Sequence, residues 1–467
     1  MKTIAIIGGG ITGLSTAYYL QKQINERKLD ATIVLIEASE QLGGKIATLP
    51  AGPFMMETGA DSIVARKSNM TPLLDELGLQ DEIVYNATGR SYIHVDGELK
   101  LIPEEAVFGI PLSLESLAGS TLLSAEGKVD ALRDFYTPNT TFTKDDSIGD
   151  FLSFFLGKEL VEKQISPVLS GVYSGELHEL TLASTLPYLL DYKNEHGSII
   201  QGLAANRAKF KGKGDKKFYS FANGLSALID RMEERIPSVD IRKGTKAERI
   251  EKAEGSSYSI RLMNGETIQA DSIVLGTLHP VAQSLLQSPM LDEEFDQMRN
   301  SSLTSVYIAF DIADDELPLD GTGFIAAENS SLICNACTWT SRKWTHTSKT
   351  SQLLVRLFYK STKPAFEKLR NGSEQELLKT ALSDVKAAMG IVAEPLHYVV
   401  TKWDDTMPNY HIRHHAIVRA LETKMAEQFP RIRLAGCSYY GVGIPDCVAN
   451  GEQIAVDLAE WLAGESE

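Results

Sequence analysis

The chain lacks the features that mark secreted and membrane-spanning proteins. It has only 4 cysteines in 467 residues, too few for a disulfide scaffold. No apolar run approaches the roughly 18 residues that span a membrane, and the richest, at 151–156, is one or two helical turns long. The apolar start at 3–7 is too short for a signal peptide. We therefore expect a cytoplasmic protein with no transmembrane segment, whose contact with membranes is at most peripheral.

Positive charge is also scarce. Lysine and arginine number 46 against 62 aspartates and glutamates, so the formal net charge is −16. This sign is wrong for a chain that mainly binds phosphate backbones, which excludes nucleic acid as a general partner. Hydrophobic residues make up 43% and charged residues 23%, the composition of a folded globular protein rather than a disordered one.

A glycine fingerprint opens the chain. Gly8-x-Gly10-x-x-Gly13 follows an expected strand at 3–7 and precedes an expected helix at 14–28, and Glu37 ends a second apolar strand at 31–36. In this context the glycines allow close approach of a pyrophosphate to the helix N-terminus, and Glu37 can accept hydrogen bonds from ribose hydroxyls. An adenine dinucleotide is predicted; a purely structural glycine turn is the alternative. The expected contacts are Gly8, Gly9, Gly10, Ile11, Thr12, Gly13, Glu37 and Ala38.

Two further patterns help to distinguish FAD from NAD as the predicted cofactor. Gly43-Gly44-Lys45 follows Glu37 closely and could let a loop approach the diphosphate and the flavin, which favours FAD. A second fingerprint, Gly321-x-Gly323-x-x-Ala326, follows Pro318-Leu-Asp instead of a strand and is interpreted as a loop. Electrons are therefore expected to enter from the substrate and to leave to oxygen or another acceptor.

Two clusters suggest metal or redox chemistry and are interpreted as structural. Cys334-x-x-Cys337 has no second cysteine pair nearby, so core or edge-strand cysteines are favoured over a zinc or dithiol site. His411-x-x-His414-His415 lacks an acidic residue at metalloprotease spacing. No metal is predicted.

The rest of the chain shows three kinds of pattern. Residues from about 103 to 190 have helical spacing and predict a mainly helical insertion. Strand-like runs at 239–242, 258–262 and 272–275, with a turn at Asn264-Gly265, predict a β-meander. Runs at 306–311, 331–338 and 353–358 predict further strands, and 374–389 a helix.

Several blocks resemble the FAD-dependent porphyrinogen oxidases, a branch of the flavin amine oxidase superfamily. Beyond the fingerprint these are Glu57-Thr-Gly-Ala-Asp-Ser62, Ser166 to Gly175, Lys243 to Ala247, Trp403-x4-Pro408-x-Tyr410 and Gly441 to Cys447. Amine oxidases commonly place a lysine of this region near the flavin. The strand at 301–310 has no lysine, which argues against amine oxidation. Arg66-Lys67 and the Cys-Thr-Trp block at 337–339 resemble the Gram-positive enzymes that act on coproporphyrinogen III.

The resemblance implies an α/β fold with a Rossmann-type FAD-binding domain, similar to p-hydroxybenzoate hydroxylase, an α+β substrate domain and a helical insertion. We expect the FAD domain at 1–62, 220–280 and 405–467, the substrate-binding domain at 63–105, 181–219 and 281–404, and the insertion at 106–180. The resemblance adds as cofactor contacts Gly43, Gly44, Lys45, Gly59, Ala60, Asp61, Ser62, Ala247, Trp403, Gly436, Val442, Gly443 and Ile444. It assigns substrate contacts to Arg66, Lys67, Arg90, Val172 and Tyr173.

The implied reaction is the oxygen-dependent, six-electron oxidation of coproporphyrinogen III to coproporphyrin III in haem biosynthesis, with release of hydrogen peroxide. Because the flavin carries the redox chemistry, no catalytic side chain is named. The alternatives are protoporphyrinogen IX oxidation, another flavin oxidase of amines or carotenoids, and a flavin-binding scaffold without activity. The expected partners are the tetrapyrrole, molecular oxygen and a ferrochelatase that would collect the product.

Overall fold

The computed structural model describes residues 1–172, 176–210, 216–253, 255, 257–317 and 319–464. One end of the molecule contains a five-stranded sheet in the order β12-β2-β1-β16-β22, in which every neighbouring pair is parallel. These strands are short apolar runs of the kind that parallel sheets bury on both faces. Their bounds are β1 (Lys2–Ile7), β2 (Ala31–Ile36), β12 (Asp240–Arg242), β16 (Ser272–Leu275) and β22 (Ile432–Leu434).

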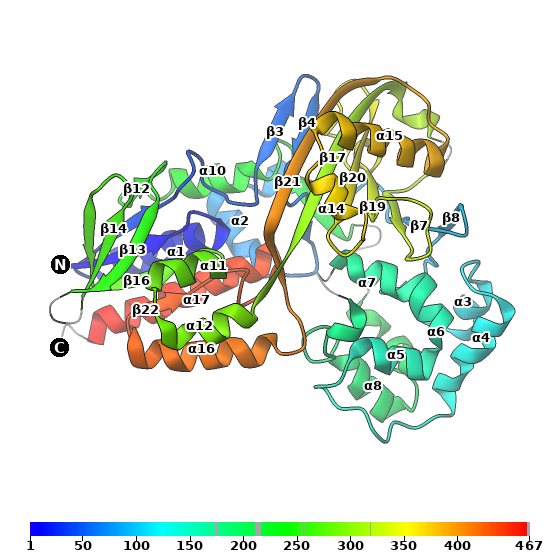
Figure 1. Ribbon diagram of the computed structural model, residues 1–467, viewed down its shortest axis with the longest axis horizontal. Helices are drawn as coiled ribbons and strands as arrows, with labels where there is room; N and C mark the ends of the chain where they lie inside the picture. The colour runs from blue at the N-terminus through cyan, green and yellow to red at the C-terminus, as the bar shows by residue number, and fades with distance from the viewer. Residues whose placement is uncertain (173–175, 211–215, 254, 256, 318, 465–467) are drawn as a thin grey trace.

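Two different layers cover this sheet because successive side chains of a strand point to opposite faces. Ile4 and Ile6 of β1 join the core formed with α1 (Ile11–Arg27), α10 (Ser226–Glu234) and α17 (Ile444–Gly464). Ala5 and Ile7 join the core on the other face, formed with α11 (His279–Leu286), α12 (Pro289–Gln297), α16 (His414–Gln428) and a three-stranded meander. The expected Rossmann-type α/β domain is therefore present (Figure 1).

The meander differs from the predicted one. It consists of β13 (Ala247–Lys252), β14 (Tyr258–Leu262) and β15 (Thr267–Ala270), and the predicted turn at Asn264-Gly265 joins its last two strands. The other two predicted runs, which form β12 and β16, belong to the parallel sheet instead. The prediction was wrong there because a short buried apolar run has the same sequence pattern in either kind of sheet.

A second sheet of seven strands has the order β21-β17-β20-β19-β18-β7-β8. Its long strands β17 (Arg299–Ala313) and β21 (Pro395–Asn409) pair antiparallel and run out of the Rossmann-type part into the second part (Figure 1). The apolar side chains of α15 (Glu374–Met389) pack on this sheet. The remaining strands are β7 (Tyr92–Val95), β8 (Glu98–Leu101), β18 (Gly323–Ala326), β19 (Ala336–Trp339) and β20 (Gln352–Lys360).

Shorter elements connect these parts. They are β3 (Thr48–Ala51), β4 (Phe54–Glu57), β5 (Ile63–Val64), α2 (Met70–Leu77), β6 (Ile83–Tyr85), β9 (Ala106–Val107), β10 (Ile110–Pro111), β11 (Phe218–Phe221), α13 (Thr340–Lys343) and α14 (Phe366–Arg370). Among them β5, β11 and β6 form a small antiparallel sheet.

The helical part has one apolar core, which runs in sequence from Ile110 to Leu203. It contains α3 (Leu114–Gly119), α4 (Ala125–Ala131), α5 (Ile148–Leu156), α6 (Lys158–Leu160), α7 (Ser166–Val172), α8 (Tyr188–His196) and α9 (Ile199–Ala205). The helices α8 and α9 thus share a core with the insertion expected at 106–180. The division of the chain into three domains stays a prediction.

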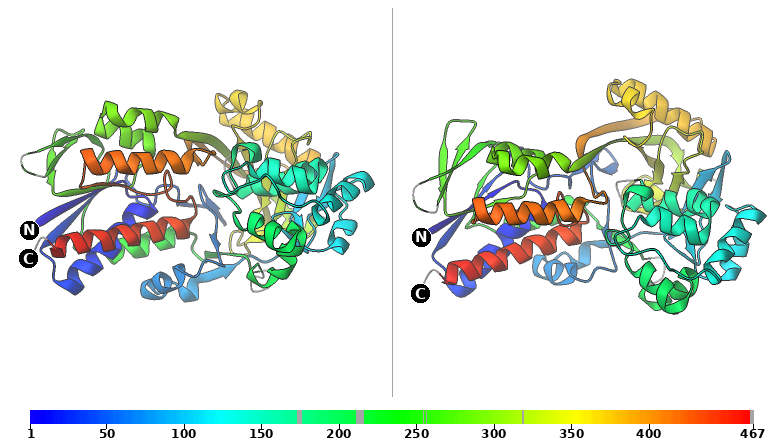
Figure 2. Two further views of the ribbon diagram at one scale, coloured as in Figure 1. Left: turned by 90° about the horizontal axis from the view of Figure 1, so that it is seen from below. Right: turned by 60° about the horizontal axis from the view of Figure 1, so that its bottom comes forward.

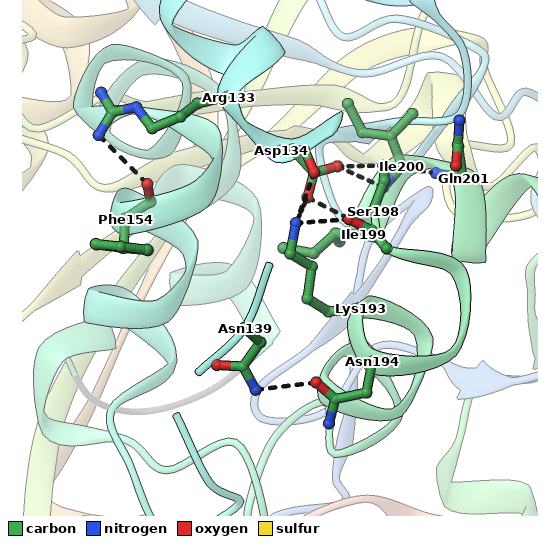
Figure 3. Close-up of polar contacts among 11 residues, drawn as sticks. Arg133, Asp134, Asn139, Phe154, Lys193, Asn194, Ser198, Ile199, Ile200 and Gln201 are labelled. Carbon is green, nitrogen blue, oxygen red and sulfur yellow. Dashed lines mark hydrogen bonds and ion pairs between the residues drawn. The ribbon is translucent and has the colours of Figure 1, made fainter. Parts of the chain in front are cut away.

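A buried ion pair ties α8 and α9 to the rest of the helical part (Figure 3). The carboxylate of Asp134 accepts hydrogen bonds from Lys193 Nζ at 3.0 Å and from Ser198 Oγ at 2.5 Å. It also accepts from the amides of Ile199 and Ile200, the first residues of α9, at 2.9 and 3.0 Å. Asp134 therefore neutralises a buried lysine and satisfies helix amides that have no partner within the helix.

The molecule is elongated. Both termini lie at one end, beside the parallel sheet, and the helical part lies at the other (Figures 1 and 2). Among the residues described, no helix is long and apolar enough to cross a membrane.

Candidate functional site

The glycine fingerprint forms a tight turn between β1 and α1. Gly8 has φ of 105°, a left-handed conformation that favours glycine. A Cβ on Gly13 would lie 2.0 Å from the Gly8 carbonyl oxygen, so only glycine fits there. A Cβ on Gly10 would meet nothing within 4 Å. No side chain caps α1 at Gly10. The turn therefore leaves open space in front of a helix N-terminus whose first amides are free to bind an anion.

Glu37 stands beside this turn, at the carboxyl end of β2. Its Oε2 accepts the Gly9 amide at 2.7 Å, and its Oε1 accepts the amide and the hydroxyl of Ser39 at 2.8 and 2.6 Å. An ionised carboxylate has about four acceptor positions, so one remains for a ribose hydroxyl.

The segment predicted to support the adenine lies next to Glu37. The amide of Thr245 donates to the Glu37 carbonyl at 2.8 Å, and that of Gly244 donates to the Ser39 carbonyl at 2.9 Å. Ala247 follows as the first, buried residue of β13. The predicted adenine segment and the predicted ribose ligand are thus adjacent.

The two other N-terminal blocks run alongside the fingerprint. Gly43 donates its amide to the Gly9 carbonyl at 2.8 Å, and a Cβ on Gly44 would lie 3.3 Å from Gly10 Cα. Ala60 then donates to the Lys45 carbonyl at 3.0 Å. Segments 8–13, 43–45 and 57–62 therefore lie side by side, and these are the segments that the resemblance assigns to a dinucleotide and its flavin.

Two side chains from the second sheet hold the segment 57–62. Arg356, on β20, is 1% exposed and donates to the carbonyls of Thr58 and Gly59 at 2.8 and 2.9 Å. Trp403, on β21, donates its indole N–H to the same Thr58 carbonyl at 3.0 Å. Trp403 was predicted at this site, whereas Arg356 was missed. A single charge within the apolar run of β20 was the signal that could have found it.

Asp61 has a cationic partner that the sequence analysis also missed. Lys343 Nζ lies 2.9 Å from the Asp61 carboxylate, and Ser62 Oγ donates to it at 2.7 Å. Burial acts to raise the pKa of Asp61, but Lys343 and Arg356 outweigh it and hold the pKa at about 2. Asp61 is therefore ionised and neutralises Lys343.

Glu57 is buried in the same segment. It accepts the Leu225 amide at 2.8 Å and the Thr48 hydroxyl at 2.9 Å. Burial raises its pKa to about 7 against these hydrogen bonds. Its charge therefore changes near neutral pH.

The C-terminal block closes the site at the carboxyl end of β22. Gly436 has φ of 91°, and a Cβ on it would lie 3.3 Å from Thr12 Oγ1 of α1. Tyr410 donates its hydroxyl to the Cys437 carbonyl and accepts the Gly441 amide, both at 2.7 Å. Its ring stacks on His414 at 3.8 Å between centroids. Tyr410 thus fixes the loop at Cys437 and Gly441, next to the predicted residues Gly436, Val442, Gly443 and Ile444.

A cavity of about 570 Å³ lies beside this loop. Tyr410, Gly441 and Val442 line one side of it, and Leu180 and Thr185 of the helical part line the other. Val442 is 51% exposed. The loop therefore has an open face toward a space of the size that small-molecule sites occupy.

The predicted propionate ligands each have a different partner. Lys67 pairs with Asp446 at the start of α17, and the Arg66 guanidinium lies over the ring of Phe108. Arg90 pairs with Glu104 at 3.5 Å. Tyr173 lies outside the described residues, and so does the side chain of Val172.

The cysteine and histidine clusters carry no metal site in the part of the chain that the structure describes. Cys334 and Cys337 are buried free thiols, and burial raises the pKa of each. Burial lowers the pKa of His414 to about 4, so its imidazole is neutral at physiological pH. The interpretation of both cysteines as core residues is confirmed.

The residues present fit a dinucleotide cofactor. The open space at Gly10, the uncapped start of α1 and the spare acceptor position of Glu37 all lie at the carboxyl ends of parallel strands, where open α/β sheets bind ligands. The segments 43–45, 57–62 and 436–444 continue this surface away from Glu37.

Comparisons with known proteins agree with this geometry. Coproporphyrinogen III oxidase of Bacillus subtilis is 34% identical over 466 residues, covering 99% of this chain and 98% of that protein. Coproporphyrinogen III oxidase of Staphylococcus aureus is 33% identical and covers 99% and 100%. The crystal structure of a protein from Exiguobacterium sp. 255-15, provisionally assigned as a protoporphyrinogen oxidase, has 32% identity and a TM-score of 0.89 over 98% of this chain and 99% of that one.

The family model described as flavin containing amine oxidoreductase matches residues 11–459. This match covers nearly the whole chain and includes the fingerprint helix, the seven-stranded sheet and the C-terminal block, whereas β1 lies before it. The chain belongs to the flavin-containing amine oxidoreductase family.

Proposed function

We propose that the protein is an FAD-dependent oxidase that converts coproporphyrinogen III to coproporphyrin III in haem biosynthesis, with oxygen as the electron acceptor. The observation that carries the proposal is full-length similarity to two coproporphyrinogen III oxidases at 34% and 33% identity. The convergence of Glu37 and the segments 8–13, 43–45, 57–62 and 436–444 on one region supports FAD as the flavin.

The reaction removes six hydrogen atoms from the macrocycle, and three oxygen molecules take them up as three molecules of hydrogen peroxide. When bound, FAD would supply the two-electron acceptor in each of three cycles. The protein's task is then to hold the cofactor and the flexible tetrapyrrole in one orientation. Gly8, Gly10 and Gly13 would admit the diphosphate, and Glu37 would bind the ribose. Trp403 and the loop 441–444 would border the flavin ring.

Substrate choice rests on charge, since coproporphyrinogen carries four propionates and protoporphyrinogen carries two. We assign Arg66, Lys67 and Arg90 to these propionates, where charge-assisted hydrogen bonds would set the orientation of the ring. In the free protein Lys67 and Arg90 pair with Asp446 and Glu104, so the substrate would compete with these carboxylates. We place Val172 and Tyr173 beside the macrocycle.

Protoporphyrinogen IX oxidation is the second candidate. It is favoured by the similarity to the Exiguobacterium protein, which has been provisionally assigned that activity. We further propose that the enzyme works in the cytoplasm and passes its product to a ferrochelatase.

The test is a direct comparison of the two porphyrinogens with purified, FAD-loaded enzyme. Porphyrin fluorescence and hydrogen peroxide are followed together, at matched concentrations and with controls that lack enzyme. Faster oxidation of coproporphyrinogen III, with one peroxide for each electron pair, supports the proposal. Faster oxidation of protoporphyrinogen IX replaces it with the second candidate, and failure to oxidise either substrate overturns both.

A further inference from the structure

Arg356 is a buried cation without a carboxylate partner. Its side chain is among the largest fully buried ones, and within the described residues no Asp or Glu lies within 4.0 Å of it. It donates to two backbone carbonyls and, at 3.2 Å, to Ser305 Oγ. Its Nε–H is buried without an acceptor in the same part of the chain. Burying an uncompensated charge costs several kcal/mol, so this arrangement is unusual for a purely structural arginine.

Among the described residues, no carboxylate pairs directly with this positive charge. The Arg356 guanidinium acts to lower the pKa of Asp61, but the salt-bridge partner of that carboxylate is Lys343, at 2.9 Å. Glu57 is the other carboxyl group whose pKa the guanidinium acts to lower; burial still raises that pKa to about 7, so Glu57 is ionised only in part at neutral pH. The remaining neighbours are the rings of Tyr307 and Phe358, at 5.0 and 4.7 Å from the guanidinium carbon. Aromatic faces attract a cation but carry no net charge.

The place of Arg356 links it to the cofactor surface. Its two carbonyl partners belong to the segment 57–62, and one of them also accepts the indole N–H of Trp403. The segment 57–62 and Trp403 are both assigned above to the flavin. An unpaired cation at this position would therefore interact most favourably with a ligand that becomes negatively charged.

We propose that Arg356 provides the buried positive charge that stabilises the negative charge which the bound flavin ring gains on reduction. This inference rests on the FAD part of the proposed function and not on the identity of the substrate. Arg356 acts here as a positioning and electrostatic residue: its hydrogen bonds fix the segment 57–62, and its charge makes the flavin easier to reduce.

Sulfite is a suitable probe because it adds to oxidised flavins and leaves an anionic adduct, which bleaches the flavin absorbance. We would titrate FAD-loaded wild type, Arg356→Lys and Arg356→Gln with sodium sulfite. Lysine keeps the charge but loses most hydrogen bonds, whereas glutamine keeps a donor and loses the charge. Arg356→Gln should weaken sulfite binding about tenfold or more, and Arg356→Lys should retain most of it.

A second pair of variants leaves Arg356 in place. Ser305→Asp puts a carboxylate next to the guanidinium, and Ser305→Asn is its uncharged counterpart of the same shape. Ser305→Asp should weaken sulfite binding about as much as Arg356→Gln does, and Ser305→Asn should not. Arg433→Gln on β22 is a control for removing a cation elsewhere in the fold. Arg433 is half-buried and donates a hydrogen bond to Ser272 Oγ.

The outcomes separate charge from structure. Equal losses in Arg356→Lys and Arg356→Gln, or equal effects of Ser305→Asp and Ser305→Asn, would overturn the inference and leave Arg356 a structural residue only. These measurements need bound FAD but no porphyrinogen. A wild type that binds FAD and sulfite but oxidises no porphyrinogen would therefore reject the proposed substrate while the inference stands.

Discussion

The amide of Gly9 donates a hydrogen bond of 2.7 Å to Oε2 of Glu37, which joins the turn after β1 to the end of β2. The same carboxylate accepts the Ser39 amide on its other oxygen at 2.8 Å. Glu37 thus shapes the glycine turn and, in our proposal, also binds the ribose of FAD. A change at this one residue should affect both tasks.

Glu37→Gln is expected to weaken FAD binding about tenfold or more, because a charge-assisted acceptor is lost. A glutamine can accept on only one of its two terminal atoms, so its NH2 group would face the amide of either Gly9 or Ser39. Titration of the apo protein with FAD, followed by flavin fluorescence, measures the effect. Glu26→Gln, an exposed substitution near the end of α1, is the control. An unchanged Kd in Glu37→Gln would remove Glu37 from the site.

Alanine at Gly10 and alanine at Gly13 should affect stability differently. Gly10 has φ of −66° and open space around its Cβ position, so Gly10→Ala should fold with stability within about 0.5 kcal/mol of wild type. Its methyl group would occupy space that we assign to the diphosphate, so FAD binding should be lost. In Gly13→Ala the new Cβ would lie 2.0 Å from the Gly8 carbonyl, which should destabilise the fold itself by about 3 kcal/mol or more.

Denaturation of the apo proteins and FAD titration of the folded variants together test this pair. Gly10→Ala should separate stability from binding, and Gly13→Ala should lose both. FAD binding by Gly10→Ala at wild-type affinity would show that the diphosphate does not pass over Gly10.

The sequence alone predicted the fingerprint, and the predicted bounds of the second strand coincide with β2 (Ala31–Ile36). Local signals suffice here, because one βαβ unit brings Gly8 to Gly13 and Glu37 together within a short stretch of chain. Arg356 and Lys343 were missed because the partners that bury and use them lie nearly 300 residues away, in the segment 57–62. Side chains from distant strands are brought to a site by topology, which no local pattern encodes.

The prediction that the strands at 239–242 and 272–275 belong to the meander was wrong for a related reason. Their composition indicates a buried strand correctly, but their partners are β2 and β1 rather than β14. Pairing depends on the crossover connections of the whole domain, whereas the turn at Asn264-Gly265 specifies the β14–β15 hairpin locally.

Because of Glu57, the folded protein should be more stable at acidic pH than at alkaline pH. Its pKa in the fold is about 7, above the ordinary value of 4.5. The folded protein then binds more protons than the unfolded chain between these values, so this contribution is fully present below pH about 4.5 and is lost as pH rises to about 7. Glu57→Gln should remove that slope and stabilise the protein at pH about 8.

Urea denaturation at several pH values between about 5 and 8, on wild type and Glu57→Gln, measures the slope. Glu82→Gln, a change at a half-exposed carboxylate that pairs with Arg231 at 3.4 Å, is the control and should leave the slope in place. Parallel pH profiles for wild type and Glu57→Gln would contradict a raised pKa at Glu57.

Lys193→Met should destabilise the helical part by about 3–5 kcal/mol, because it leaves the buried carboxylate of Asp134 without its cation. Lys144→Met is the matched control: Lys144 pairs with Asp191 of the same helix α8 at 3.0 Å, but both side chains are nearly half exposed, and such pairs contribute about 0–1 kcal/mol.

Hydrogen exchange is the appropriate measurement, because a chain with several cores need not unfold in one step. Amides of α5, α8 and α9 should exchange faster in Lys193→Met and at the wild-type rate in Lys144→Met. Amides of β1 and α1 should keep their protection in both variants, since their core is separate from that of the helical part. Equal protection of α9 in wild type and Lys193→Met would mean that the amides of Ile199 and Ile200 hold Asp134 in place without the lysine.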